Sequence, residues 1–239
     1  MTKFTQKEID ELNSTINSAQ DALKWASENL HPKIAKASSF GAEDAAITDM
    51  MIKVNPEFRF FTLDTGRLPQ ATYDIMDDVR KKYGIKFEVL FPDTIEVQQM
   101  VRDKGMNLFY DSVENRKLCC EIRKVHPTNK MLKTLDGWIT GLRRDQTSNR
   151  NDARMFEIDT QHDDILKINP IINWTWDQVW KYIKENNVPY NKLLDKGYPS
   201  IGCEPCTRAI KDGEDLRAGR WWWENEGHKE CGLHIDYKK

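Results

Sequence analysis

The chain has 239 residues, of which 39% are apolar and 31% are charged, and its formal net charge is −2. This length and composition fit one or two globular domains and exclude a disordered chain. The near balance of charge gives no overall attraction to nucleic acid or to a membrane surface, and the sequence shows neither a signal peptide nor a membrane-spanning run. We therefore expect a cytoplasmic protein without nucleic-acid or membrane partners.

Predicted helices and strands alternate over the first two-thirds of the chain. The first helix is predicted over residues 6–29, where Thr5 and Glu8 form a capping box. The predicted strands, the first three each followed by a helical segment, are residues 34–39, 59–63, 87–91, 138–142 and 165–168. This alternation with short links is typical of a parallel sheet that is covered by helices.

The pattern becomes irregular toward the C-terminus. Residues 175–187 are predicted to form a helix, with Thr175 and Gln178 as its capping box, and Gly, Pro and Cys then punctuate the chain. We expect a single α/β domain over residues 1–239, with a mostly parallel central sheet and helices on both faces. An irregular C-terminal tail is expected at residues 217–239.

Two of the predicted strands end in loops of small and polar residues, which are SSFGAED at residues 38–44 and LDTGR at residues 63–67. Ligands of open α/β sheets bind beyond the carboxyl ends of the strands, where backbone N–H groups at a helix start can hold a phosphate. Each loop alone is a weak signal, since most such turns bind nothing. The motifs GxxxxGK[ST] and GxGxxG are absent, which argues against an ordinary ATPase and a Rossmann dehydrogenase.

The cysteines form two close pairs and one isolated residue, namely Cys119, Cys120, Cys203, Cys206 and Cys231. An odd number of cysteines in a cytosolic protein argues against a disulfide framework. Thiolates at the spacing of the two pairs are typical ligands of soft metals. We therefore expect four cysteines to bind a metal and one to carry out chemistry.

Spacing alone leaves three interpretations of these cysteines open. A four-iron cluster suits the adjacent Cys119 and Cys120, because each thiolate can bind a different iron, whereas neighbouring side chains tend to diverge from a single tetrahedral zinc. A zinc site could instead combine the Cys-x-x-Cys pair with Cys231 and His234. The cysteines could also be buried apolar residues without a metal.

The chain contains, in this order, the segments SSFGAED, LDTGRLP, KLCCEIRKVHP, GLRRDQT, IGCEPCTRA and ECGLH. With them it resembles the bacterial adenylyl-sulfate (APS) reductases of the wider phosphoadenylyl-sulfate (PAPS) reductase family, from about residue 35 to residue 234. The resemblance implies a fold like that of the adenine-nucleotide alpha-hydrolases. It also implies reduction of APS to sulfite and AMP, in sulfate assimilation and cysteine biosynthesis.

The same resemblance implies roles for individual residues. It implies a [4Fe–4S] cluster that lies near the substrate without carrying the electrons, bound by Cys119, Cys120, Cys203 and Cys206. The implied substrate-binding residues are Ser38, Ser39 and Gly41 in the nucleotide loop, Leu63 and Thr65 at the adenosine, Lys124 between cluster and substrate, Arg143 and Arg144 in a mobile arginine loop, and Arg217, Arg220 and His234 over the sulfate.

Cys231 is the expected catalytic residue, because a thiolate is a soft nucleophile that attacks sulfur readily. It would take up the sulfonate of APS as an S-sulfocysteine and release AMP, and thioredoxin or glutaredoxin would then release sulfite. Cations near the site would offset the repulsion between the thiolate and the anionic substrate and lower the thiol pKa. Assembly into a homo-oligomer is left open.

Three other functions compete with this interpretation. The nearest is a PAPS reductase, against which we count Glu43 and Asp44, since acidic side chains should disfavour an additional 3′-phosphate. The second is a sulfur-transferring enzyme that modifies nucleic acid, which the balanced net charge disfavours. The third is a zinc-binding interaction module without catalytic activity.

Overall fold

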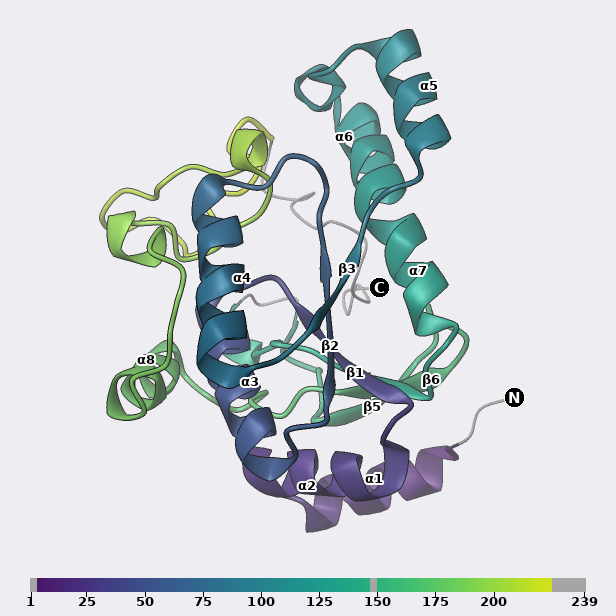
Figure 1. Cartoon of the computed structure of the whole chain (residues 1–239), viewed down its shortest axis with the longest axis vertical. Coiled ribbons are helices and arrows are strands. Elements are labelled where there is room, and N and C mark those ends of the chain that lie inside the picture. Colours follow the sequence, from purple (N-terminus) through teal and green to yellow (C-terminus); the bar gives the residue numbers. More distant parts are fainter. Residues whose placement is uncertain (1–3, 147–149, 225–239) are drawn as a thin grey trace.

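The computed structural model describes residues 4–146 and 150–224. Within these ranges six strands form one sheet in the order β3-β2-β1-β4-β6-β5 (Figure 1). The strands are β1 (Ile34–Ser38), β2 (Arg59–Leu63), β3 (Phe87–Leu90), β4 (Gly137–Ile139), β5 (Phe156–Asp159) and β6 (Ile165–Ile168). All neighbouring strands are parallel except β5 and β6, which confirms the predicted α/β fold with a mostly parallel sheet.

Helices cover both faces of the sheet. Successive residues of a strand point to opposite sides, so apolar side chains on both faces of a buried strand need a covering layer. On β1, Ile34 belongs to the large core that also includes α3, whereas Ala35 packs with Trp138 of β4 and Met131 of α7. Figure 1 accordingly shows α3 and α4 on one side of the sheet and α7 on the other. The helices are α1 (Gln6–Thr15), α2 (Ala19–Leu30), α3 (Ala42–Val54), α4 (Gln70–Tyr83), α5 (Thr94–Lys104), α6 (Val113–Cys120), α7 (His126–Leu132) and α8 (Trp176–Glu185).

The helix predicted over residues 6–29 is wrong in one respect, because it is interrupted between α1 and α2. Ser18 has an extended backbone conformation, and its hydroxyl accepts a hydrogen bond from the N–H of Asp21 at 3.0 Å. Ser18 therefore caps the start of α2 and satisfies a backbone donor that the helix leaves open. The predicted capping box of Thr5 and Glu8 is present at the start of α1.

One continuous helical run carries the first cysteine pair. Helices α6 and α7 are joined by a π-helical segment at Glu121–Val125, so that Cys119, Cys120 and Lys124 lie on the same run. The sequence patterns did not predict this helical run from α6 to α7, and they did not predict the edge strand β5. A π-helical turn is rare, and where it occurs it is frequently found at functional sites.

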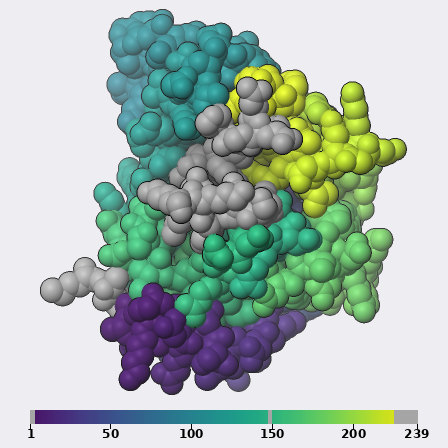
Figure 2. All heavy atoms as spheres, turned by 180° about the vertical axis from the view of Figure 1, so that it is seen from behind, coloured from purple at the N-terminus to yellow at the C-terminus, as the bar shows by residue number. Residues whose placement is uncertain are grey.

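No helix in residues 4–146 and 150–224 is long and apolar enough to cross a membrane. The predicted single domain over residues 1–239, with its tail at 217–239, stays a prediction because residues 225–239 lie outside the described residues. The described part of the C-terminal segment, yellow in Figure 2, adjoins the teal region of α5 and α6. Bonds between Arg116 of α6 and Glu224 at 2.8 and 2.7 Å connect the two regions.

Candidate active site

A cavity of about 250 Å³ lies at the carboxyl ends of the central strands. From β1 the strand order runs through β2 to β3 on one side and through β4 on the other. Strands β1 and β4 therefore flank a topological switch point, which is where open α/β sheets bind ligands. We call this space the substrate cavity. The predicted substrate-binding residues that line it are Ser38, Ser39, Gly41, Leu63, Thr65, Lys124, Arg143, Arg217 and Arg220.

Three further predicted site residues are not among the described residues that line the cavity. Arg144 is not among the residues that line the substrate cavity, and its guanidinium donates a hydrogen bond to the Asn173 side chain instead. Cys231 and His234 lie outside the described residues, so their predicted roles are not tested by the structure.

The loop after β1 presents a helix start to the substrate cavity. Gly41 is the N-cap of α3 and lines the cavity, and the preceding Phe40 has a φ of 60°, which turns the chain sharply at this point. The Ser39 backbone N–H and hydroxyl donate to Asp44 at 2.6 and 2.8 Å. The same carboxylate binds the ammonium of Lys36, which is fully buried on β1. The loop is therefore fixed from below while the positive end of α3 faces the cavity.

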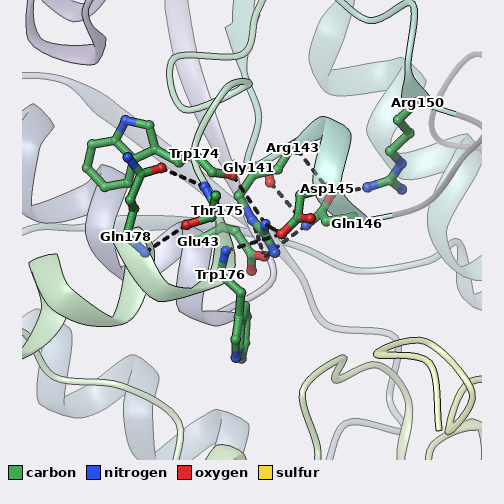
Figure 3. Close-up of polar contacts among 10 residues, drawn as sticks. All are labelled: Glu43, Gly141, Arg143, Asp145, Gln146, Arg150, Trp174, Thr175, Trp176 and Gln178. Atoms are coloured by element: carbon green, nitrogen blue, oxygen red, sulfur yellow. Dashed lines mark hydrogen bonds and ion pairs between the residues drawn. The ribbon is translucent and has the colours of Figure 1, made fainter. Parts of the chain in front are cut away.

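Arg143 is held by carboxylates at the end of β4. Its side chain is fully buried, and its guanidinium bonds Glu43 at 3.0 and 2.9 Å and Asp145 at 3.0 Å (Figure 3). Gln146 donates a further hydrogen bond to Glu43 at 3.0 Å. These contacts place Arg143 against carboxylates at the cavity wall, and its membership of a mobile arginine loop stays a prediction.

These ion pairs also change what Glu43 and Asp44 indicate about the choice between APS and PAPS. Glu43 and Asp44 were expected to repel an additional phosphate, but Glu43 pairs with Arg143 and Asp44 pairs with Lys36. A carboxylate with a buried cation beside it contributes little net negative potential. The two acidic residues therefore do not separate APS from PAPS as substrates.

The four cysteines of the two pairs gather beside the substrate cavity. All four are buried and belong to one cluster, and together they line a small neighbouring cavity that we call the cysteine pocket. The Cys203 sulfur lies 3.2 Å from the Thr65 hydroxyl, which itself lines the substrate cavity. The other residues of the cysteine pocket are Arg67, Phe109, Arg116, Arg123, Lys124, Pro205 and Trp221.

Within residues 4–146 and 150–224, no group of three or more Cys, His, Asp or Glu side chains is arranged to hold a metal ion. The zinc site that combines the Cys-x-x-Cys pair with Cys231 and His234 is not tested, because both of these residues lie outside the described part of the chain.

The thiols of the cysteine pocket differ in their affinity for protons. Burial raises the pKa of Cys119, and burial together with the charge of Cys203 raises the pKa of Cys206 to about 12. Burial acts in the same direction on Cys203, but the ammonium of Lys124 and the hydroxyl of Thr65 outweigh it and lower the pKa of that thiol. Negative charge in the pocket is thus favoured beside Lys124, which lines both cavities.

Trp221 is a site residue that sequence reasoning missed. Its ring is buried and lies 4.6 Å from the guanidinium carbons of both Arg116 and Arg220. It lines both cavities, and its indole N–H has no hydrogen-bond partner within the described residues. The run of three tryptophans directly after Arg220 was the available signal, but composition could not show which ring turns inward.

Comparisons with known proteins agree with this geometry. Residues 33–209 match the phosphoadenosine phosphosulfate reductase domain. The adenosine 5′-phosphosulfate reductase of Burkholderia cepacia is 47% identical over 215 residues, which are 90% of this chain and 86% of that protein. A crystal structure of PAPS reductase from Candida auris, in a phosphate complex, superimposes with a TM-score of 0.74 at 30% identity and covers 87% of this chain and 98% of that one.

A more distant likeness concerns the fold alone. The FMN adenylyltransferase of Candida glabrata, solved with FMN and an ATP analogue, gives a TM-score of 0.54 at 13% identity, covering 90% of this chain and 80% of that one. The predicted likeness to α/β folds that bind adenine nucleotides is thereby confirmed at the level of architecture.

Proposed function

The chain belongs to the phosphoadenosine phosphosulfate reductase family, and from this premise we propose that it reduces adenosine 5′-phosphosulfate to sulfite and AMP in sulfate assimilation. The observation that carries the proposal is the shared wall between the two cavities. Lys124 and Trp221 line both the substrate cavity at the strand ends and the cysteine pocket beside it. A bound nucleotide would therefore place its anionic end next to the cysteines.

We propose that Cys119, Cys120, Cys203 and Cys206 bind a [4Fe–4S] cluster. The donor set fits, because such a cluster takes one thiolate on each of its irons. The surroundings also fit, because Arg123 Nε and Trp221 Nε1 are buried there without an acceptor among the described residues and could donate to cluster sulfur. A bound cluster would supply a fixed negative charge that Lys124 and its neighbours compensate.

The residues of this chain would divide the binding of substrate between them. The loop after β1, with Ser38, Ser39 and Gly41, would hold the phosphate at the start of α3. Leu63 and Thr65 would contact the adenosine at the end of β2. The sulfonate would meet Lys124, Arg217 and Arg220, to which the proposal adds His234 from the C-terminal tail. Arg144 would have to leave Asn173 to take part.

The chemical step falls to Cys231. Its thiolate would attack the sulfur of APS, form an S–S bond to the sulfonate and expel AMP with the electron pair of the broken S–O bond. A thiolate of thioredoxin or glutaredoxin would then attack the Cys231 sulfur and expel sulfite, and the second thiol of that partner would resolve the mixed disulfide. The two thiols supply both electrons. This chemistry suits the cytoplasm, where thiols stay reduced.

Replacement of the nucleophile tests the proposal. We expect Cys231→Ser to retain iron, sulfide and AMP binding but to form no sulfite, because only the attacking sulfur is lost. Wild-type protein mixed with APS without reductant should gain the mass of one sulfonate on Cys231, and the variant should gain none. Sulfite production by the variant would refute the mechanism, and loss of bound metal would favour the zinc site that includes Cys231.

PAPS is the alternative substrate, favoured by the solved PAPS reductase relative and by the neutralised Glu43 and Asp44. Comparison of kcat/KM for APS and PAPS, with the same thioredoxin, decides between them. A ratio well above ten in favour of APS supports the proposal, whereas equal values would make the enzyme one of dual specificity.

A further inference from the structure

The hydroxyl of Thr128 is a buried polar group that the proposed mechanism does not use. Thr128 lies on α7, its side chain lines the substrate cavity, and the residue is only 2% exposed. Within the described residues its Oγ1 atom has no hydrogen-bond partner. Buried hydroxyl groups in folded proteins almost always have a partner, because desolvation without one is unfavourable.

The usual local partner is not used here. A threonine inside a helix normally bonds the carbonyl oxygen four residues earlier, which for Thr128 belongs to Lys124. That carbonyl lies in the π-helical segment Glu121–Val125, where the regular α-helical spacing is broken. The Thr128 hydroxyl is therefore left for a group inside the cavity.

The walls around Thr128 indicate what kind of group this is. Phe61, Ala37 and Trp138 line the cavity on the same face of the sheet and pack with the next turn of α7. Large apolar and aromatic surfaces with a few polar groups are typical of sites for a flat heterocycle. The charged part of the substrate has a different place, because Lys124 lies one turn earlier, at the cysteine pocket.

We propose that the Thr128 hydroxyl forms a hydrogen bond with the adenine of the bound nucleotide and is a specificity-determining residue of the substrate cavity. The inference rests on the proposed function, since it takes the ligand to be an adenosine phosphate. It assigns the base to the space between α7 and the sheet, below Lys124, and the phosphosulfate to the part of the cavity between Lys124 and the loop after β1.

Two variants of Thr128 separate the hydroxyl from the shape of the side chain. Thr128→Val keeps the volume and removes the hydroxyl, whereas Thr128→Ser keeps the hydroxyl. The probes are AMP and ribose 5-phosphate, which lacks the base, each measured as a competitive inhibitor of sulfite formation. We expect Thr128→Val to weaken AMP roughly three- to tenfold, Thr128→Ser to stay close to wild type, and ribose 5-phosphate to be unaffected by either.

The thermal stability of the variants completes the test. Because the described residues offer the hydroxyl no partner, Thr128→Val should unfold at the same temperature as wild type or higher. Unchanged AMP inhibition by Thr128→Val would overturn the inference, and so would equal weakening of AMP and ribose 5-phosphate, which would place the contact on the sugar phosphate. Failure of wild-type protein to bind AMP at all would instead refute the proposed function.

Discussion

The two ends of the substrate cavity use buried cations in opposite ways. Near the loop after β1, each buried cation has a carboxylate beside it, with Lys36 on Asp44 and Arg143 on Glu43. At the cysteine end, Arg116 pairs with Glu224, whereas the buried Arg123 and the half-buried Lys124 lie among thiols, and no described carboxylate lines the cysteine pocket. Buried charges are tolerated in proteins when they are compensated. The cations of the first end are therefore compensated by carboxylates, whereas the cations of the second end would stabilise an anionic ligand such as the proposed cluster.

The largest effect that tests this comparison is expected from Cys206→Ser. If the cysteine pocket is completed by an iron–sulfur cluster, removal of one of its four thiolates should lower the iron and sulfide content of protein purified without oxygen to a small fraction of wild type. Iron and sulfide analysis and the visible absorption of the cluster measure this. Cys231→Ser is the matched control, because it removes a thiol that the proposal leaves off the cluster. Equal iron in both variants would contradict the assignment.

The opposite end predicts an effect on stability instead. Glu43→Gln leaves Arg143, whose side chain is fully buried, without its main carboxylate, and should lower the free energy of unfolding by about 3 kcal/mol. Asp145→Asn is a matched control, since Asp145 binds the same guanidinium at 3.0 Å but its side chain is 53% exposed. Its loss should cost less than about 1 kcal/mol.

Urea unfolding of the two variants under identical conditions gives the measurement. Iron content should stay at the wild-type level in both, because neither residue lines the cysteine pocket. Equal destabilisation by Glu43→Gln and Asp145→Asn would show that burial does not set the strength of the ion pairs of Arg143. Loss of iron in Glu43→Gln would show that the loop end of the cavity affects the cysteine pocket, which contradicts the comparison.

The same comparison shows which features the sequence could predict. Local patterns were sufficient for the parallel sheet and for the loops that bring Gly41 and Thr65 to the cavity, because strand ends and small residues are readable within a few positions. Metal-ligand chemistry predicted that distant cysteines would meet. The pair of Glu43 and Arg143 was not predictable in this way, because a contact between residues 100 apart depends on strand order, which no local pattern encodes.

Short elements were missed for a related reason. The edge strand β5 has only four residues, and the run α6, π-helix and α7 lacks a single continuous apolar stripe because the π-turn shifts its register. The break at Ser18 was missed because the apolar pattern continues across it, although Ser18 and Asp21 offered a local capping signal for the start of α2. Orientation of side chains, such as that of Trp221, follows only from the assembled fold.

The smallest effect concerns an exposed pair on the helical run that carries the cysteines. A hydrogen bond that the His126 ring donates to the Glu96 carboxylate at 3.0 Å, with a further contribution from Glu121, raises the pKa of His126 above its ordinary value of 6.5. The protonated histidine is thus favoured by folding, and its stabilising effect is complete below pH 6.5 and disappears as the pH rises through the raised pKa. Since the side chains of His126 and Glu96 are each 41% exposed, solvent weakens the effect.

We therefore expect His126→Gln to lower the melting temperature slightly at pH 5.5 and not at pH 8.5, as measured by thermal unfolding in matched buffers. Lys24, which pairs with Glu28 at 3.9 Å on α2, offers a control, because Lys24→Gln removes a more exposed cation that does not titrate in this range. A deficit of the His126 variant that grows toward pH 8.5 would reverse the predicted sign. A loss of stability as large as that of Glu43→Gln would mean that the exposed pair of His126 and Glu96 is as strong as the buried pair of Arg143 and Glu43. Burial would then not explain the difference between the two regions, because it is the property in which these pairs differ most.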